Sequence, residues 1–182
     1  MGNYIYGEEK GGEPKMKPQS KVIIKMLKSK LTLIKVIETM KIYVNTTFPE
    51  TRLNSSQFDD VFCAMLNNTR PTFDLLAEEG YVDIHQAFIS MAVFADGHFD
   101  DKIKSIFCFF DLSGDGDLDR KELSIFVQSS IVGLCKTTGL PPPSVMGIQN
   151  YTVQVFQDID NDGSGQVDFE EFSYWVKNSD QI

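Results

Sequence analysis

Two twelve-residue segments place oxygen-bearing side chains at offsets that suit one spherical cation each. In the first segment, positions 1, 3, 5, 7, 9 and 12 are Asp111, Ser113, Asp115, Asp117, Asp119 and Glu122. The same positions of the second segment are Asp160, Asp162, Ser164, Gln166, Asp168 and Glu171. Because Ca²⁺ takes roughly six to eight hard oxygen ligands, a short loop has to coil around it. The spacing therefore predicts two Ca²⁺ sites with these residues as ligands.

Other positions of the two segments agree with this chemistry. Gly116 and Gly165 stand at position 6, where the chain must reverse sharply. Position 7 donates only its backbone carbonyl, which explains why Asp117 and Gln166 both occur there. The closing glutamates bind through both oxygens and raise the coordination number above what Mg²⁺ prefers. The predicted ion is therefore Ca²⁺.

Acidic surface turns are the plain alternative, since Asp, Gly and Ser are ordinary turn residues. Turn chemistry explains neither the glutamate at position 12 nor the apolar residue at position 8 of both segments, Leu118 and Val167. We expect these two residues to face each other in a short antiparallel contact that couples the two sites.

Amphipathic helices are predicted on both sides of each segment. Apolar residues recur at helical spacing before and after the first segment and again around the second. Helix, loop and helix occur twice, so residues 100–178 are predicted to form one paired unit. Both segments resemble the loops of the EF-hand family.

Two degenerate copies of the same pattern precede this pair. Residues 80–88 match position 6 onward, with Val82 at position 8, while Leu75 and Ala77 at positions 1 and 3 cannot ligate. Gln86 replaces the closing glutamate. A fainter copy runs from Thr46 to Gln57, with Leu53 at position 8. Residues 46–99 are therefore predicted to form a hand pair that binds no ion.

Two silent hands followed by two complete ones resemble several four-hand proteins: neuronal calcium sensors, calcineurin B and its relatives, and calaxin of ciliary outer dynein arms. This resemblance implies an all-α fold with two lobes of paired helix-loop-helix hands and short β contacts between loops. It implies a calcium sensor that regulates a target protein. The alternative is a structural calcium-binding subunit of a large cytoskeletal assembly such as the ciliary axoneme, attached to dynein arms or microtubules.

Calcium binding at the closing glutamate moves the helix that follows it and opens an apolar groove in sensor hands. We expect an amphipathic helix of the target to bind this groove in the C-terminal lobe. The expected lining is Phe107, Phe110, Phe126, Ile131, Phe156, Phe172 and Trp175. The alternative is that these side chains only form the core.

The N-terminal part of the chain has the opposite charge from the rest. Residues 1–44 hold nine lysines and four glutamates, whereas residues 45–182 hold 8 basic and 22 acidic residues. Residues 1–20 are predicted to be a flexible leader, and residues 21–45 a basic amphipathic helix. The helix places Lys21, Lys25, Lys28 and Lys35 in one narrow sector.

This lysine sector has two interpretations. It is either a solvated face of a packed helix or a contact for an anionic partner, such as lipid headgroups, an acidic tubulin-like surface or an acidic helix. N-myristoylation of Gly2 is a weaker hypothesis, because Tyr6 stands where Ser or Thr is usual.

The remaining features narrow the functional class. The segment Thr137–Ser144 contains three consecutive prolines and is expected to loop out of the lobe as a spacer or docking element. Residues 179–182 are a tail. The three cysteines indicate reduced thiols and a cytoplasmic location, with Cys108 expected in the core. The resemblance to calaxin implies the cilium or axoneme as an alternative location, and the basic helix suggests a peripheral membrane location. No nucleic-acid partner is expected. No catalytic motif is present, so we expect no enzyme.

Overall fold

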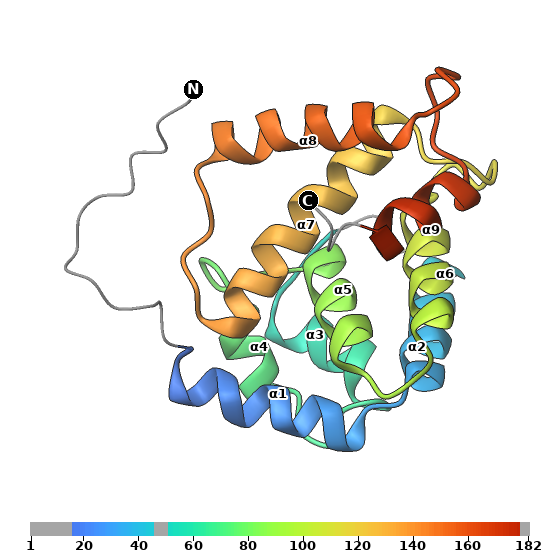
Figure 1. The fold of residues 1–182 in the computed structure, drawn as a ribbon. Helices are drawn as coiled ribbons and strands as arrows, with labels where there is room; N and C mark the ends of the chain where they lie inside the picture. The colour runs from blue at the N-terminus through green and yellow to red at the C-terminus, as the bar shows by residue number, and fades with distance from the viewer. Residues whose placement is uncertain (1–15, 46–50, 179–182) are drawn as a thin grey trace.

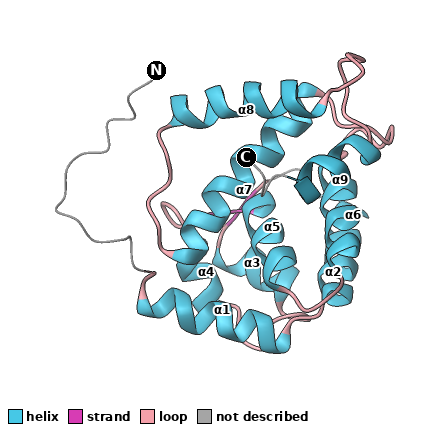
Figure 2. Cartoon of the chain, in the orientation of Figure 1, coloured by secondary structure: helices cyan, strands magenta, loops and turns pink. Residues whose placement is uncertain are grey.

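The computed structural model describes residues 16–45 and 51–178 and is almost wholly helical (Figures 1 and 2). Its N-terminal half comprises α1 (Pro18–Lys30), α2 (Leu33–Asn45), β1 (Arg52–Leu53), α3 (Ser55–Phe62), α4 (Arg70–Leu76), β2 (Val82–Asp83) and α5 (Ile84–Phe94). Its C-terminal half comprises α6 (Phe99–Phe110), α7 (Arg120–Thr138), α8 (Val145–Ile159) and α9 (Phe169–Asn178). This is the predicted all-α class. Within the described ranges, no helix has both the length and the apolar composition needed to cross a membrane.

The prediction of one basic helix over residues 21–45 is wrong, because this region folds as two helices. α1 already begins at Pro18, a residue that suits the first helical position, so the predicted leader ends earlier than residue 20. The chain leaves the helix at Leu31, where Asp96 N donates to Leu31 O and Leu33 N donates to Asp96 O, both at 2.8 Å. These tertiary backbone bonds replace the helical ones and separate α1 from α2. The rest of the predicted leader, residues 1–15, lies outside the described residues.

Short β contacts join the loops in pairs, as predicted. In the C-terminal half, Leu118 N donates to Val167 O at 2.8 Å and Val167 N donates to Leu118 O at 2.9 Å. In the N-terminal half, β1 pairs antiparallel with β2, so that Leu53 faces Val82. Both pairs of apolar side chains are fully buried. Each half is therefore built around one pair of facing loops.

A continuous row of aromatic rings joins the two halves into one core. It runs through Phe62, Phe88, Phe109, Phe110, Phe126 and Phe172, and successive ring centroids are 5.2, 4.8, 5.2, 5.3 and 5.1 Å apart. These rings come from α3, α5, α6, α7 and α9. Aromatic pairs at such distances add to the burial of apolar area, which is the main driving force for folding. The lobes therefore share their packing.

Helix α7 is the longest described helix and crosses between the halves. Figure 1 shows it running from the loop after α6 toward α4, with α8 packed across its first turns. It ends at Gly139, which adopts the left-handed conformation with φ 78°. The three prolines beyond it are exposed, as expected for a segment that loops out, but Leu140, Pro141 and Pro142 border a cavity shared with α1. The linker therefore lies beside the N-terminal helix.

Candidate calcium-binding loops

Each acidic segment connects two helices at a fixed geometry. Asp111 and Asp160 follow the last residues of α6 and α8, and both have ψ near 78°, which turns the chain out of the helix. The glycines at positions 4 and 6 of both loops have positive φ between 71° and 96°. An L side chain rarely adopts this conformation, so glycine is required where the loop closes on itself.

In the first loop, the position-1 carboxylate organises the backbone around it. Gly114 N and Gly116 N donate to Asp111 at 2.8 and 3.0 Å, and the Ser113 hydroxyl donates to it at 3.2 Å. Asp115 accepts from Asp117 N at 3.1 Å. This bond and one from Ser113 lower the pKa of Asp115. The lowered pKa favours the ionised carboxylate.

The closing glutamate connects the two ends of each loop. Glu122 is buried and accepts from Ser113 N at 2.7 Å and from Asp119 N at 2.9 Å. Glu171 similarly accepts from Asn161 N at 2.9 Å and from Asp168 N at 3.3 Å. Each glutamate therefore draws the beginning of its loop toward the helix that follows.

The position-9 aspartates cap those helices. Asp119 accepts from Glu122 N at 2.7 Å at the start of α7, and Asp168 accepts from Glu171 N at 2.8 Å at the start of α9. Such caps typically stabilise a helix by about 1 kcal/mol. Asp119 and Asp168 are exposed. Their role in the structure is capping, and their predicted role as ligands stays a prediction.

Three carboxylates converge in the second loop. Ligand oxygens of Asp160, Asp162 and Glu171 all lie within 4.8 Å of one another, and in the described part of the chain no other three acidic, histidine or cysteine side chains converge in this way. The pKa of Asp162 is lowered, mainly by the hydrogen bond from Ser164 N. Hard, ionised oxygens that converge on one point fit a Ca²⁺ ion. Ser164, at position 5, points its hydroxyl at Gln166 O.

A contact between the loops involves Gln166, for which the sequence predicts only a backbone role. Its Nε2 donates to Asp115 Oδ2 of the first loop at 3.3 Å. Asp115 is therefore turned toward the second loop. No sequence pattern could have found this contact, because the two residues are 51 positions apart.

The N-terminal loops keep the same framework without carboxylates at positions 1, 3 and 12. Asn54 caps α3 and exchanges hydrogen bonds with Gln57 in a capping box, as Asp119 does with Glu122. Asp83 caps α5. Burial raises the pKa of Asp83, but bonds from His85 and Gln86 outweigh it, and the pKa is lowered overall. Residues 46–50 of the faint first loop lie outside the described residues.

Most of the side chains predicted to line a C-terminal groove are buried in the core instead. Phe107, Phe110, Phe156 and Phe172 are no more than 4% exposed. An apolar cavity of about 280 Å³ remains between α5, α6, α7 and α9, bordered by Phe126, Phe172 and Trp175 among others. The groove in this structure is small because α5 packs against the same surface.

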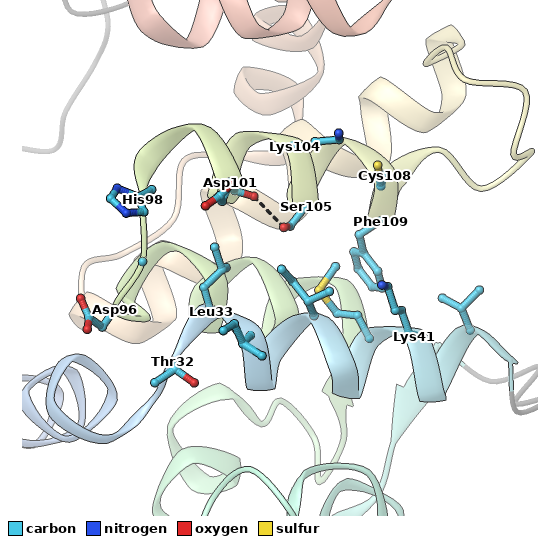
Figure 3. Close-up of a pocket in the computed structure, with 15 residues that line it drawn as sticks. Thr32, Leu33, Lys41, Asp96, His98, Asp101, Lys104, Ser105, Cys108 and Phe109 are labelled. Carbon is cyan, nitrogen blue, oxygen red and sulfur yellow. Dashed lines mark hydrogen bonds between the residues drawn. The ribbon is translucent and has the colours of Figure 1, made fainter.

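A larger apolar cavity of about 650 Å³ lies between α2 and α6 (Figure 3). Leu33 comes from α2, and Phe109 and Cys108 from α6. Cys108 is exposed, so the prediction that it is a core residue is wrong: three of the four residues 107–110 face the core, and Cys108 occupies the outward side of the helix. The sequence contained one signal for this cavity, since apolar residues cover most of the circumference of the 21–44 segment.

Comparison with known proteins agrees with this geometry. Residues 100–177 match the EF-hand domain pair family. The chain is similar to guanylyl cyclase-activating protein 1 of Gallus gallus, 27% identical over 61% of this chain and 52% of the relative. It is also similar to calaxin of Danio rerio, 28% identical over 54% of this chain and 45% of the relative.

A third relative is the guanylyl cyclase inhibitory protein of Lithobates pipiens, 25% identical over 77% of this chain and 62% of the relative. The chain spans roughly half the length of the curated relatives it matches. The matched residues include both acidic loops, and the fold has their helix-loop-helix arrangement. The molecule therefore has an all-α EF-hand fold, and its residues 100–177 match an EF-hand domain pair.

Proposed function

We propose that this chain is a calcium-binding regulatory protein that holds two Ca²⁺ ions, one in loop 111–122 and one in loop 160–171. The convergence of Asp160, Asp162 and Glu171 carries the proposal. The first loop shares its glycine turns, its capping aspartate and its closing glutamate with the second. The acidic composition of residues 45–182 supports cation binding in both.

The proposed ligands follow the positions of the hand. Side-chain oxygens at positions 1, 3, 5 and 12 and the backbone carbonyls of Asp117 and Gln166 surround the ion, while Asp119 and Asp168 act at position 9. The closing glutamates lie in the first turns of α7 and α9. Any movement of these glutamates toward the loop centre therefore shifts the two helices that follow.

The regulatory step is binding of an amphipathic helix from a target protein, without catalysis by this chain. Phe126, Phe172 and Trp175 border the cavity between α6, α7 and α9, and a shift of α7 or α9 widens it. The net negative charge of this half favours a target helix with basic residues beside its apolar face.

Trp175 provides the test, because it is the single tryptophan of the chain and lies at this cavity. We expect calcium to change its fluorescence and to increase binding of a hydrophobic dye, relative to chelator. A synthetic basic amphipathic peptide should then change the emission again only with calcium present. Equal spectra in calcium and chelator contradict a sensor role, and a Glu171→Gln variant controls for nonspecific ion effects.

The similarity to calaxin and one surface of α1 favour a second candidate function. Lys21, Lys25 and Lys28 are exposed on α1, while Ile23, Ile24 and Leu27 face the core. Lys35 lies on α2, so the predicted lysine sector is divided between two helices. In this alternative the chain is a structural calcium-binding subunit in the cytoplasm or cilium, and its α1 lysines contact an acidic cytoskeletal or lipid surface.

Cosedimentation separates the possible surfaces. A Lys21→Gln, Lys25→Gln, Lys28→Gln variant should lose binding to microtubules if tubulin is the partner, or to phosphatidylserine vesicles if lipid is. If wild type and variant sediment equally in both assays, the basic face is only a solvated surface. Calcium is kept constant, so this result is independent of the sensor test.

A further inference from the structure

The silent second loop encloses a polar cavity of about 290 Å³. Its lining includes Glu78, Asp83 and Gln86 from the loop, and also Lys136 from α7. Glu78 and Gln86 stand at positions 4 and 12 of the degenerate hand, so Gln86 occupies the place of a closing glutamate. A cation from another part of the chain therefore reaches into a loop that has no side-chain oxygen at positions 1 and 3.

The Lys136 ammonium group is held by two oxygens of this loop. Its Nζ donates to Glu78 Oε2 and to Gln86 Oε1, each at 3.0 Å. The Lys136 side chain is only 17% exposed, although lysine amines usually extend into water. The same contact lowers the pKa of Glu78. The ammonium group thus bonds to the oxygen at the closing position.

A second feature of α7 favours the same contact. Gly133 lies one turn before Lys136, and a Cβ atom there would be 2.8 Å from Gln86 O and 3.0 Å from Ser90 Oγ. Glycine weakens a helix interior, so its presence requires a reason. Here it lets α7 approach the backbone of the closing residue of the second loop. Gly133 and Lys136 therefore both lie against Gln86 on one face of α7.

We propose that the ammonium group of Lys136 is the resident cation of the second loop, where it substitutes for the metal ion and ties α7 to the N-terminal hands. Glu122 and Lys136 are fourteen residues apart in one helix, which separates them by about 21 Å along its axis. Helix α7 thus carries a closing glutamate of one hand in its first turn and the substitute cation of another in its last.

This arrangement couples the two halves of the molecule. Any displacement of α7 at Glu122 is transmitted to Lys136 and from there to Glu78 and Gln86. The coupling rests on the proposed calcium binding of the third hand, whereas the occupancy of the second loop by Lys136 does not. The two statements therefore require separate experiments.

The first experiment tests occupancy on the full chain in chelator. Lys136→Met and Gln86→Met should each lower the melting temperature by about 2–4 °C, a shift typical of one lost interaction in a chain of this size. The double variant should melt no lower than the less stable of the two single variants, because both changes remove the same interaction. Lys136→Arg should retain most of the stability. Lys25→Met, which removes an exposed charge from α1, is the control.

Additive shifts in the double variant would show that Lys136 and Gln86 do not act together, and the proposal would be overturned. A Lys136→Met variant that melts at the wild-type temperature would overturn it as well.

The second experiment follows backbone amide resonances of the second loop by NMR during a calcium titration. We expect the amides of Gly80, Val82 and Asp83 to shift together with those of residues 111–122 in the wild type. In Lys136→Met, the second-loop shifts should fall to less than half. If the third loop responds and the second loop does not, the coupling is wrong. If neither complete loop responds, the proposed function fails, and the thermal experiment alone decides the Lys136 assignment.

Discussion

The second and third loops of this molecule share a framework and differ in what fills it. In both, an apolar residue at position 8 pairs with the neighbouring loop, and an aspartate at position 9 caps the next helix. The third loop has Asp111 and Glu122 where the second has Leu75 and Gln86. The framework of a hand is therefore maintained by backbone pairing, capping and burial, and it does not require the metal ligands.

The two loops differ in the source of their cation. The third loop has carboxylates at positions 1, 5, 9 and 12, and its proposed cation comes from solution. The second has no carboxylate at positions 1 and 12 and receives the Lys136 ammonium from α7. A loop can thus lose its ion and remain part of the structure, provided that its remaining oxygens find donors within the fold.

The largest expected effect tests whether the two halves depend on one core. Phe110 is fully buried, with its ring centroid 5.3 Å from that of Phe126 and 5.6 Å from that of His85 in the other half. We expect Phe110→Ala to lower the free energy of unfolding by about 3–5 kcal/mol. Chemical denaturation measures this. Phe99→Ala, on the same helix but 57% exposed, should change it little, and equal effects would contradict a shared core.

The second-largest effect is expected from a variant that makes the complete fourth loop resemble the silent second loop. Glu171→Gln places in the fourth loop the residue type that closes the second. Because it removes a charged bidentate ligand, we expect calcium affinity at that site to fall by roughly a hundredfold, or about 2.7 kcal/mol. Calorimetric titration measures the change. The reverse variant, Gln86→Glu, should add no calcium site, since Leu75 and Ala77 still offer no side-chain oxygen.

A third prediction concerns the close contact of α7 with the second loop. Gly133→Ala should raise helix propensity by about 1 kcal/mol, yet the clash with Gln86 O should outweigh this and destabilise the chain by about 1–3 kcal/mol. Gly147→Ala in α8 is the matched control, because its new Cβ meets side-chain atoms only, the Ser144 hydroxyl at 3.2 Å and Pro143 Cβ at 3.9 Å, and no backbone carbonyl. Thermal denaturation compares the two. A stabilising Gly133→Ala would show that α7 is not held tightly there.

The smallest expected effect is the pH dependence of the Glu78–Lys136 pair. The pKa of the Glu78 carboxyl is lowered in the folded protein. The contribution of the pair to stability is therefore present above the usual glutamate pKa and is lost as pH falls through the lower folded value. We expect Glu78→Gln to be less stable than the wild type at pH 7 by about 1 kcal/mol or less, because Glu78 is largely exposed. The difference should vanish once the pH lies below the folded pKa of Glu78. Denaturation of both proteins from pH 7 downward measures this. A stability difference between the wild type and Glu78→Gln that stays constant with pH would contradict the pairing.

The local features of the fold were predictable from the sequence because short patterns determine them. Loop glycines, capping aspartates and the position-8 pair Leu118 and Val167 all follow from spacing within one hand. The faint first loop could be aligned by Leu53 alone, and the structure pairs this residue with Val82.

The features that sequence reasoning missed depend on residues far apart in the chain. Leu31 leaves its helix because of hydrogen bonds with Asp96, and the lysine periodicity around it contains no sign of this. Lys136 reads as an ordinary lysine in the last turn of a helix, since its partner Gln86 is 50 positions away. Such contacts are decided by how helices pack, which no local pattern records.

Calcium stoichiometry of the 182-residue chain tests the central claim most directly. Native mass spectrometry at a calcium concentration that just fills the wild-type sites should detect two bound ions, and Glu122→Gln and Glu171→Gln should each retain one. A wild-type chain that binds no calcium, or that keeps two ions after both glutamates are replaced, would contradict the assignment of loops 111–122 and 160–171 as the calcium sites.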